Sequence, residues 1–515
     1  MGLKTFYHLI DHGKSQEAFL VVRTLQGEDK LEGELIKALL TGQASGDYEQ
    51  FDPLIEQILA KTQKNPLYHS FARATKAYIL LSQAKHKEAL KELELAQKAW
   101  TELELIQPSL DILSKYRQIK TQYFQTWLWT VEACFHLLRG YEAYPLALRL
   151  FSRSLSVALK KWFPTKLLAL LIYNDMGGVY ERLGEWSQAI DCHNEGLAIG
   201  RSLENKNTQL YPLIKLGSIY HIQGDLDLAL QYMQEGLETA QDINAVLGIT
   251  RGLTGIGSIY HSKGEFQKAM DYYQQSLTVA REMQIIVFSD LSSILWNLCL
   301  LHLDLKRLDQ ARDFLAQLQS HIKIDKNPDF RSKYLLAEAL ILKTSKRFKE
   351  KAQAQDLLKE VFKDKNTNQR TRFLSMLHLC DLLLQEVKTF EDEALLQEVL
   401  TLVKKLIELT HTWQFTPDLI MTLVLQAKLA TIEGDINKAL ELLEQAREIA
   451  EEKKLVNLIN QVKSEQTSLK NELNKWQALA DRNASLQERI AFIEIEEYLQ
   501  EAVKIRDLTP ETRLP

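Results

Sequence analysis

Three stretches of the chain share one order of apolar and polar positions. Residues 216–225 read LGSIYHIQGD, residues 255–265 read GIGSIYHSKGE, and a third copy, MGGVYERLGE, begins at Met176. In each copy a Gly and a Tyr three positions apart share one helical face, a Gly and an acidic residue follow, and a second apolar period begins. The pattern predicts a helix, a tight turn and a second helix in every unit.

Each repeated place in this pattern has a physical role in joining two helices. A Gly on the first helix lets the second helix approach closely, and the Tyr one turn later fills the remaining space. A Gly at the turn accepts the left-handed conformation that ends a helix, so two antiparallel helices can be joined in a few residues. The residues are Gly177, Gly217 and Gly257 for close approach, Tyr180, Tyr220 and Tyr260 for filling, and Gly184, Gly224 and Gly264 for the turn.

An alanine near the start of the second helix extends the phase to most of the chain. After Ala147 these alanines follow one another at intervals of 40 to 45 residues, which predicts about eleven hairpins over residues 1–450. Phe51 takes the place of an alanine, and the longer interval from Ala89 to Ala147 indicates an insertion or a lengthened helix pair near residues 100–126. The markers are Ala18, Ala89, Ala147, Ala189, Ala229, Ala269, Ala311, Ala352, Ala394 and Ala439.

Composition agrees with an all-α chain. Glycine (21 residues) and proline (10) are few among 515 residues, and Pro212 and Pro417 fall where first helices are expected to begin, so that their missing N–H groups cost little. The net charge is −5 and both signs are interspersed, which argues against a nucleic-acid partner. The four cysteines are far apart and form no CxxC, as in a reduced protein without disulfides or zinc.

The chain also lacks the sequence features of export and membrane insertion. Its first residues contain no apolar core of signal-peptide length, and no segment approaches the roughly 18 continuous apolar residues of a membrane span. The position where a myristoylation motif needs Ser or Thr is Phe6. We therefore expect a cytoplasmic protein with no membrane partner.

The units resemble tetratricopeptide repeats (TPRs) in their order of apolar-Gly-x-x-Tyr, Gly-acidic-aromatic and Ala. Their 40-residue length is similar to the longer variant of the Leu-Gly-Asn repeat scaffold proteins and the kinesin light chains, against 34 in the usual repeat. The resemblance implies an α-solenoid, a right-handed superhelix of stacked hairpins whose first helices line a concave face.

The last segment departs from the repeat. Apolar residues there step by four and three positions, which predicts a long amphipathic helix, a break at residues 483–485 and a second helix to about Asp507. Capping of the last hairpin is the favoured interpretation, and folding back into the groove or pairing with a partner's helix are the alternatives. The apolar series is Leu455, Ile459, Val462, Leu469, Leu473 and Trp476.

These patterns divide the chain into four parts. Residues 1–125 are expected to form degenerate hairpins with the insertion near 100–126, and residues 126–320 the core array. Residues 321–454 are expected to form further degenerate repeats, and residues 455–515 capping or coiled-coil-like helices.

Polar residues on the expected concave face are the candidate binding residues. Together they form a mixed, modestly basic strip that suits a peptide with carboxylates or exposed backbone amides. The asparagine ladder of the Leu-Gly-Asn repeats is present only at its first place, because Ile214 and Thr254 stand at the next two. Lys215 and Arg251 resemble part of the carboxylate clamp of chaperone-binding repeats. The candidates are Asn174, Arg182, Lys215, Ser218, His221, Arg251, Thr254, Ser258 and His261.

Catalytic and metal-binding patterns are not found in the sequence. The sequence has no phosphate loop, dinucleotide fingerprint or nucleophile elbow. His8 and His12 share a helical face but lack the accompanying Glu and a third ligand, and His221 and His261 are expected on separate helices about 8–10 Å apart. We expect no enzyme activity, cofactor or metal.

The leading interpretation is a non-enzymatic scaffold that binds a peptide segment or helix of a partner protein in its concave groove and is regulated by its C-terminal helix. The alternative is a peptide-sensing signalling or transcription regulator. Self-association through the C-terminal helix is a further hypothesis about partners.

Overall fold

The computed structural model consists of α-helices throughout the part that it describes. It describes residues 7–476 except 10–14, 46–51, 64, 83–84, 107–114, 139–142, 161–165, 184, 224, 283–287, 323–327, 365–366, 368, 391, 414–415, 453–454 and 473–474, and beyond them only residues 478, 482 and 488. Helices up to α11 are α2 (Ser15–Thr24), α3 (Gly27–Ser45), α4 (Asp52–Thr62), α5 (Pro66–Ser82), α6 (His86–Ile106), α7 (Lys115–Leu138), α8 (Tyr144–Ala158), α9 (Leu167–Leu183), α10 (Trp186–Ser202) and α11 (Lys206–Gln223). The remainder are α12 (Leu226–Asp242), α13 (Val246–Ser262), α14 (Phe266–Glu282), α15 (Phe288–Asp304), α16 (Leu308–Ile322), α17 (Pro328–Lys343), α18 (Phe348–Lys363), α19 (Gln369–Phe390), α20 (Glu393–Trp413), α21 (Thr416–Glu433), α22 (Ile436–Glu452) and α23 (Val456–Asn471).

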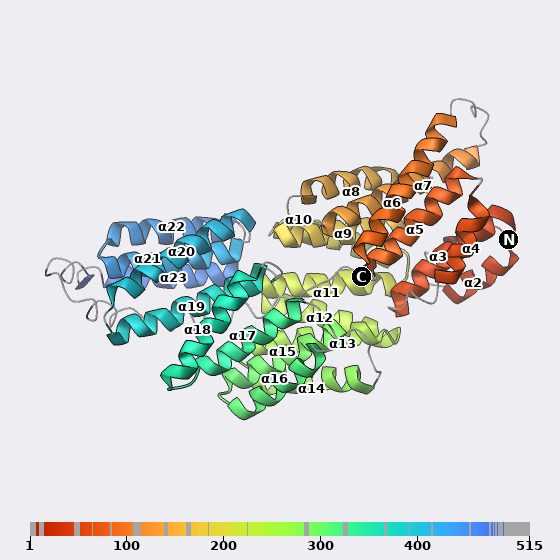
Figure 1. The fold of residues 1–515 in the computed structure, drawn as a ribbon. Coiled ribbons are helices and arrows are strands. Elements are labelled where there is room, and N and C mark those ends of the chain that lie inside the picture. The colour runs from red at the N-terminus through yellow and green to blue at the C-terminus, as the bar shows by residue number, and fades with distance from the viewer. Residues whose placement is uncertain are drawn as a thin grey trace. The chain divides into compact units, whose positions relative to one another are not determined.

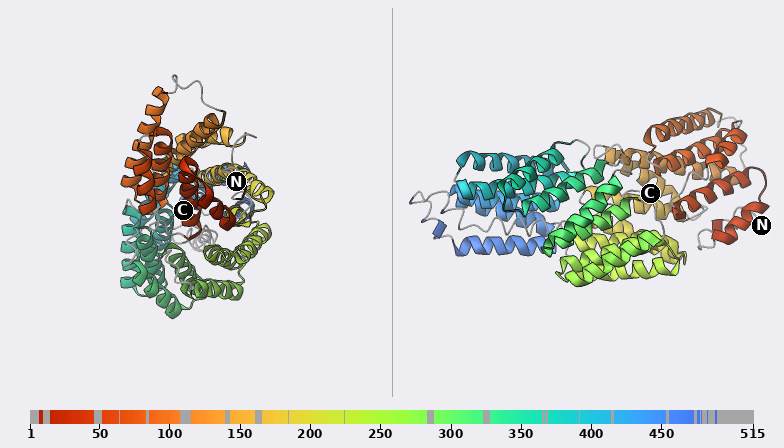
Figure 2. Two further views of the ribbon diagram at one scale, coloured as in Figure 1. Left: turned by 90° about the vertical axis from the view of Figure 1, so that its right-hand side faces the viewer. Right: turned by 60° about the horizontal axis from the view of Figure 1, so that its bottom comes forward.

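The helices pair into stacked hairpins, which confirms the predicted α-solenoid class (Figure 1). First helices of neighbouring hairpins contact one another directly, α13 with α15, α15 with α17 and α17 with α19. A second helix packs against the first helix before it and the first helix after it in the hairpins of α14, α16, α18, α20 and α22. Figure 2 shows the same pairs from two other sides.

The helices form two compact units. One contains Met1–Arg182, Ser187–Lys215 and Glu511–Pro515, and the other contains Leu183–Trp186 and Leu216–Pro510. We call them the N-terminal and C-terminal units. The four domains expected from sequence stay a prediction, although α6 with 21 residues and α7 with 24 are longer than the 17-residue α9 and α10 beyond them.

The glycines of the first helices lie where the second helix approaches most closely. A Cβ atom at Gly177 would lie 2.5 Å from Cε1 of the His193 ring. At Gly217 it would lie 2.7 Å from Cγ of Met233, and at Gly257 2.7 Å from Cδ1 of Tyr273. Since no real Cβ tolerates such distances, the repeated Gly is explained by helix packing.

The repeat tyrosines, which follow the close-approach glycines by one helical turn, lie at the edge of the contact between the two helices of each hairpin. Tyr220 stacks on Tyr232 with ring centroids 5.5 Å apart, and Tyr260 stacks on Tyr272 at 5.6 Å. All three repeat tyrosines are half-buried, including Tyr180. The stacking partners Tyr232 and Tyr272 each lie one residue before a fully buried residue of the second helix, Met233 and Tyr273. The sequence pattern did not indicate these stacking contacts.

The turns follow the predicted chemistry where they are described. Gly264 has φ +74°, in the left-handed region that favours glycine, and Gly434 has φ +91°. The acidic residue after the turn caps the second helix, since Asp225 Oδ1 accepts a hydrogen bond from the backbone N–H of Leu228 at 3.1 Å. Gly184 and Gly224 lie outside the described residues.

Two predicted marker positions were wrong. Most marker alanines are buried, but Ala352 and Ala394 are exposed. In α18 the buried series is Ala354, Leu358 and Val361, with the same steps of four and three as Ala311, Leu315 and Leu318 in α16. The error at Ala352 arose because α18 carries two alanines two positions apart, and only the packing of the helix distinguishes the buried one from the exposed one.

The prediction for Pro212 was also wrong, because the helix starts earlier. Pro212 lies inside α11, which begins at Lys206. The Oδ1 atom of Asn205 accepts a hydrogen bond from the backbone N–H of Asn207 at 3.1 Å and starts the helix there. Pro417 lies in the first turn of α21, as predicted.

The first tail helix packs against the last hairpin. Helix α23 packs against α22 and α21, as a first helix of another repeat would do. Leu455, Leu458, Val462 and Leu469 are buried there. The helix ends at Asn471, so the predicted single long helix to residue 483 is shorter in the structure, and the expected break at residues 483–485 lies outside the described residues.

Candidate functional site

A charged group is buried among three helices of the N-terminal unit. Glu181 on α9 accepts a hydrogen bond from Lys215 on α11 at 2.9 Å and is bonded to Nε2 of His193 on α10 at 2.8 Å. Lys215 is only 1% exposed and His193 is fully buried. The group joins the three helices through one carboxylate.

The charges of this group stabilise one another. Burial alone would raise the pKa of Glu181, but the Lys215 ammonium and the His193 hydrogen bond lower it to about 2. Burial also lowers the pKa of His193, despite the neighbouring carboxylate, so its ring is neutral near pH 7 and donates Nε2–H to Glu181. Lys215 therefore provides the positive charge that keeps Glu181 ionised.

Asn174, a predicted peptide-binding residue, lies on α9 as Glu181 does and faces α10. Its side chain is 7% exposed, and its Oδ1 would be 2.9 Å from a Cβ at Gly196 on α10. Oδ1 accepts no hydrogen bond from the described residues. Gly196 leaves room for this amide against the second helix.

The two repeated histidines bridge neighbouring first helices of the C-terminal unit. His221 is 2% exposed, and its Nε2 lies 2.8 Å from Oγ of Ser262 on α13. Nε2 of His261 lies 2.8 Å from Oδ2 of Asp304 at the end of α15. The histidines occur at matching places because each ties its helix to the first helix of the next hairpin.

Charged pairs also bridge neighbouring first helices further along the C-terminal unit. Lys343 on α17 pairs with Asp381 on α19 and lies 3.3 Å from Nδ1 of His378. Lys428 on α21 pairs with Glu465 on α23 at 2.6 Å. Together with the histidine bonds, these pairs bridge neighbouring first helices. They do not share one repeat position, because Lys428 lies six residues before Gly434 whereas His261 lies three residues before Gly264.

The predicted hydroxyl residues are mainly buried and bonded within their own hairpin. Ser258 is 7% exposed and accepts a hydrogen bond from Tyr273 OH at 3.0 Å. Thr254 Oγ1 lies 2.9 Å from Ser276 Oγ on α14. Ser218 is 3% exposed. The bonds of Ser258 and Thr254 hold the two helices of their hairpin together.

The two predicted arginines are the members of the candidate set whose side chains reach solvent most freely. Arg251 on α13 is held by Asp290 on α15, with Nε 3.1 Å from Oδ1 and Nη2 3.4 Å from Oδ2, and its side chain is 42% exposed. Arg182 is exposed and donates a hydrogen bond to Tyr144 OH at 3.3 Å. Arg251 is thus an oriented cation on the first-helix face.

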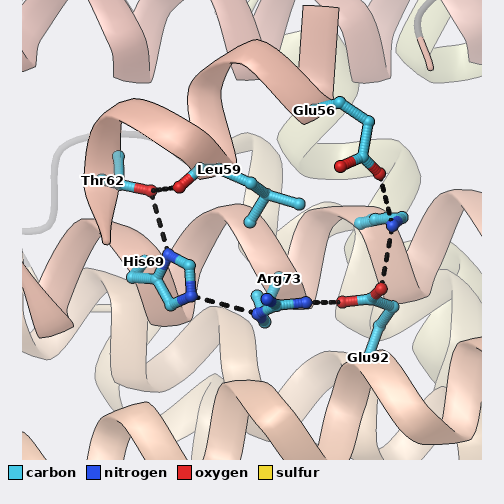
Figure 3. Close-up of polar contacts among 7 residues, drawn as sticks. Glu56, Leu59, Thr62, His69, Arg73 and Glu92 are labelled. Carbon is cyan, nitrogen blue, oxygen red and sulfur yellow. Dashed lines mark hydrogen bonds and ion pairs between the residues drawn. The ribbon is translucent and has the colours of Figure 1, made fainter. Parts of the chain in front are cut away.

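A second polar network was missed in the sequence. It links α4, α5 and α6, where Glu92 accepts hydrogen bonds from Arg73 and from Lys76, and Lys76 also pairs with Glu56 at 2.6 Å (Figure 3). Arg73 is also bonded to Nε2 of His69 at 3.1 Å. No repeated motif marks these residues, and the three acid–base pairs join separate helices across 16 to 20 positions.

This network predicts a pH dependence of stability. Burial would raise the pKa of Glu92, but hydrogen bonds from Lys76 and Arg73 hold it below its usual value of 4.5. Its contribution is therefore present above about pH 4.5 and is lost as the pH falls through the lower folded-state pKa. We expect E92Q to destabilise these helices by about 2 kcal/mol at pH 7 and by less at pH 3, measured as the shift in thermal midpoint at each pH. An equal shift at both pH values would contradict this interpretation.

Two tryptophans, two positions apart on α7, divide between the inside and the outside of the helix pair. Trp127 is buried and its ring lies 5.4 Å from that of Tyr78. Trp129 is half-buried, with the Arg153 guanidinium 3.9 Å over its ring. Two residues two apart on a helix face different directions, as expected.

Neither a metal-ligand cluster nor a membrane-spanning helix occurs among the described residues. No three His, Cys, Asp or Glu side chains come together there as a metal site would require. Among the helices that the structure describes, none combines the length and the apolar character needed to cross a membrane. His8 is exposed, and His12 lies outside the described part.

The fold and its inter-helix bridges define a TPR-type helical-repeat protein. The model of the MalT-like TPR region matches residues 160–461, more than half of the 515-residue chain. The chain belongs to this family. No curated protein matches the sequence.

Two solved structures share the fold. The apo form of the quorum sensor NprR from B. thuringiensis is 16% identical with a TM-score of 0.51, covering 73% of this chain and 99% of that one. The apo form of RapI is 14% identical with a TM-score of 0.50, covering 72% of this chain and 95% of that one. At such low identity the likeness concerns the fold.

Proposed function

We propose that this chain is a non-enzymatic protein-interaction scaffold that binds a peptide segment of a partner on the first-helix face of α13 and its neighbours. The observation that carries the proposal is the Arg251–Asp290 pair. Its guanidinium is exposed yet held in one orientation by two contacts to Asp290. A guanidinium presented in this way can bind a carboxylate or a backbone carbonyl of a partner.

The bridges between first helices support a preorganised binding face. His221 with Ser262 and His261 with Asp304 fix the spacing of successive first helices. A peptide that binds such a face loses conformational freedom while the protein loses little.

The candidate residues therefore have two roles, which we assign separately in each unit. In the C-terminal unit the buried residues Ser218, His221 and Ser258 hold the first-helix face in place. The less buried residues Arg251, Thr254 and His261 are the candidates for direct contact with the peptide. In the N-terminal unit Asn174 and Lys215 are buried, and Arg182 is the exposed candidate.

The proposal predicts a specific loss on removing one guanidinium. Phage-displayed random peptides are selected on the full chain, and the affinity of the enriched peptide is measured by fluorescence anisotropy. R251A is expected to weaken binding about tenfold, because it removes a charge-assisted hydrogen bond.

Arg281 provides the matched control. It is an arginine on α14, the second helix of the same hairpin, and is bonded to Gln317 at 2.6 Å. R281A is expected to bind as the wild type does. Failure to enrich any peptide, or equal affinities for R251A and R281A, would count against the proposal.

A peptide-sensing signalling or transcription regulator is the second candidate, since the quorum sensor NprR has this fold. The two functions differ in the response of the protein to a bound peptide. A sensor changes the hydrogen exchange of helices remote from the peptide, whereas a scaffold changes only those that contact it. Hydrogen exchange of the full chain with and without the enriched peptide separates the two.

A further inference from the structure

Two exposed aromatic rings lie side by side on the C-terminal unit. Phe348 begins α18 and Phe390 ends α19, and their ring centroids are 5.7 Å apart. Their exposed fractions, 63% and 58%, are the largest of the large apolar side chains in the described part of the chain. A single exposed apolar residue is ordinary, but two adjacent phenylalanines are a feature of interaction surfaces.

The helices that carry these rings are held together next to them. Lys351 on α18 donates a hydrogen bond to Oε1 of Gln385 on α19 at 3.0 Å. Gln355 donates to Oε1 of Glu386 at 2.8 Å, one turn further along. The ring pair is therefore a fixed feature of the α18–α19 packing.

Opposite charges flank the two rings. Lys346, Arg347 and Lys349 are exposed beside Phe348, at the N-terminus of α18. Asp392 and Glu393 are exposed two and three residues after Phe390, where α20 begins. The basic residues lie at the positive end of the α18 dipole, where Glu350 already pairs with Arg347 at 3.4 Å. Lys346 and Lys349 therefore remain as the cations that a carboxylate from outside would relieve.

We propose that this Phe348–Phe390 patch, with its basic and acidic flanks, binds the same patch of a second copy of the chain about a two-fold axis. A two-fold axis places each surface against itself, so the basic flank of one copy faces the acidic flank of the other on both sides. The four phenylalanine rings then pack together between them. A partner of one charge sign would be attracted by one flank and repelled by the other.

The small size of the patch determines the strength of the association. Two phenylalanines and their flanks cover less than the roughly 800 Å² per partner of a standard stable interface. We expect a reversible dimer with a Kd of about 10–100 µM that weakens as salt screens the flanks.

Sedimentation velocity of the full chain tests the role of the rings. The wild type is expected to dimerise with rising concentration, and F348A/F390A to weaken the dimer at least about tenfold. L159A is the matched control, since Leu159 is 53% exposed in the N-terminal unit. A wild type that stays monomeric up to about 500 µM, or an F348A/F390A chain that dimerises like the wild type, would overturn the proposal.

Charge exchange tests the two-fold arrangement. One variant, K346E/K349E, makes both flanks acidic. The other, E391K/D392N/E393K, makes both flanks basic, and the asparagine introduced by D392N retains a side-chain oxygen that can accept the hydrogen bond from the backbone N–H of Ala394, as Asp392 Oδ1 does at 2.8 Å.

Each variant alone is expected to dimerise about tenfold more weakly, and an equimolar mixture to form a heterodimer at least as tight as the wild-type dimer. Because this result is a gain of binding, misfolding cannot imitate it. A mixture that associates no better than either variant alone would exclude the two-fold arrangement.

Discussion

Replacing Lys215 with methionine is expected to lower the local free energy of unfolding of α9, α10 and α11 by about 3–5 kcal/mol. Methionine fills most of the same space but removes the ammonium that pairs with Glu181 at 2.9 Å. The carboxylate would then remain in a largely buried place, bonded to a neutral His193. An uncompensated buried charge costs more than the pair contributes, because the charge loses both water and its partner.

Hydrogen exchange of the amides in these helices is the appropriate measurement, since repeat proteins can open locally. The double variant E181Q/K215M carries neither charge and is expected to recover more than half of the loss. The effect of K215M should also diminish as the pH falls from 4.5 toward the folded-state pKa of Glu181, about 2, because the carboxylate becomes neutral in the variant first. A loss below about 1 kcal/mol, or no recovery in E181Q/K215M, would show that the pair is not stabilised in this way.

Two adjacent glycines of α9 are expected to respond to alanine in opposite directions. In G177A the new Cβ would lie 2.5 Å from the His193 ring, which is held in place by its bond to Glu181. Overpacking of this kind costs about 1–3 kcal/mol. The higher helix propensity of alanine returns about 1 kcal/mol, so we expect a net loss of up to about 2 kcal/mol.

Gly178 is the matched control one position away. A Cβ there would meet nothing closer than the Tyr211 hydroxyl at 3.9 Å. G178A is therefore expected to be neutral or to stabilise the helix by up to about 1 kcal/mol. The same hydrogen-exchange measurement compares the two variants, and a G177A chain as stable as G178A would refute the close-packing explanation of the repeated glycine.

The repeat could be read from the sequence because its requirements are local and periodic. The close-approach glycines, the turn Gly264 and most of the marker alanines have the places predicted for them. Ala352 and Ala394 were wrong because several apolar patterns of similar period fit the weaker repeats. His193 was missed, although it stands where Met233 and Tyr273 stand in the next two hairpins and meets the glycine of its own first helix.

The sequence by itself determined that this protein is a stack of helical hairpins, because one helix face, one turn and one close contact recur with a period of about 40 residues. Only the tertiary structure decided what the polar side chains do. Lys215 finds Glu181 34 positions away, His221 finds Ser262 41 positions away, and Phe348 lies against Phe390 at the surface. Such contacts depend on how far each hairpin is shifted and rotated relative to the next one. The period of the sequence gives the number of residues per repeat but not this shift or rotation.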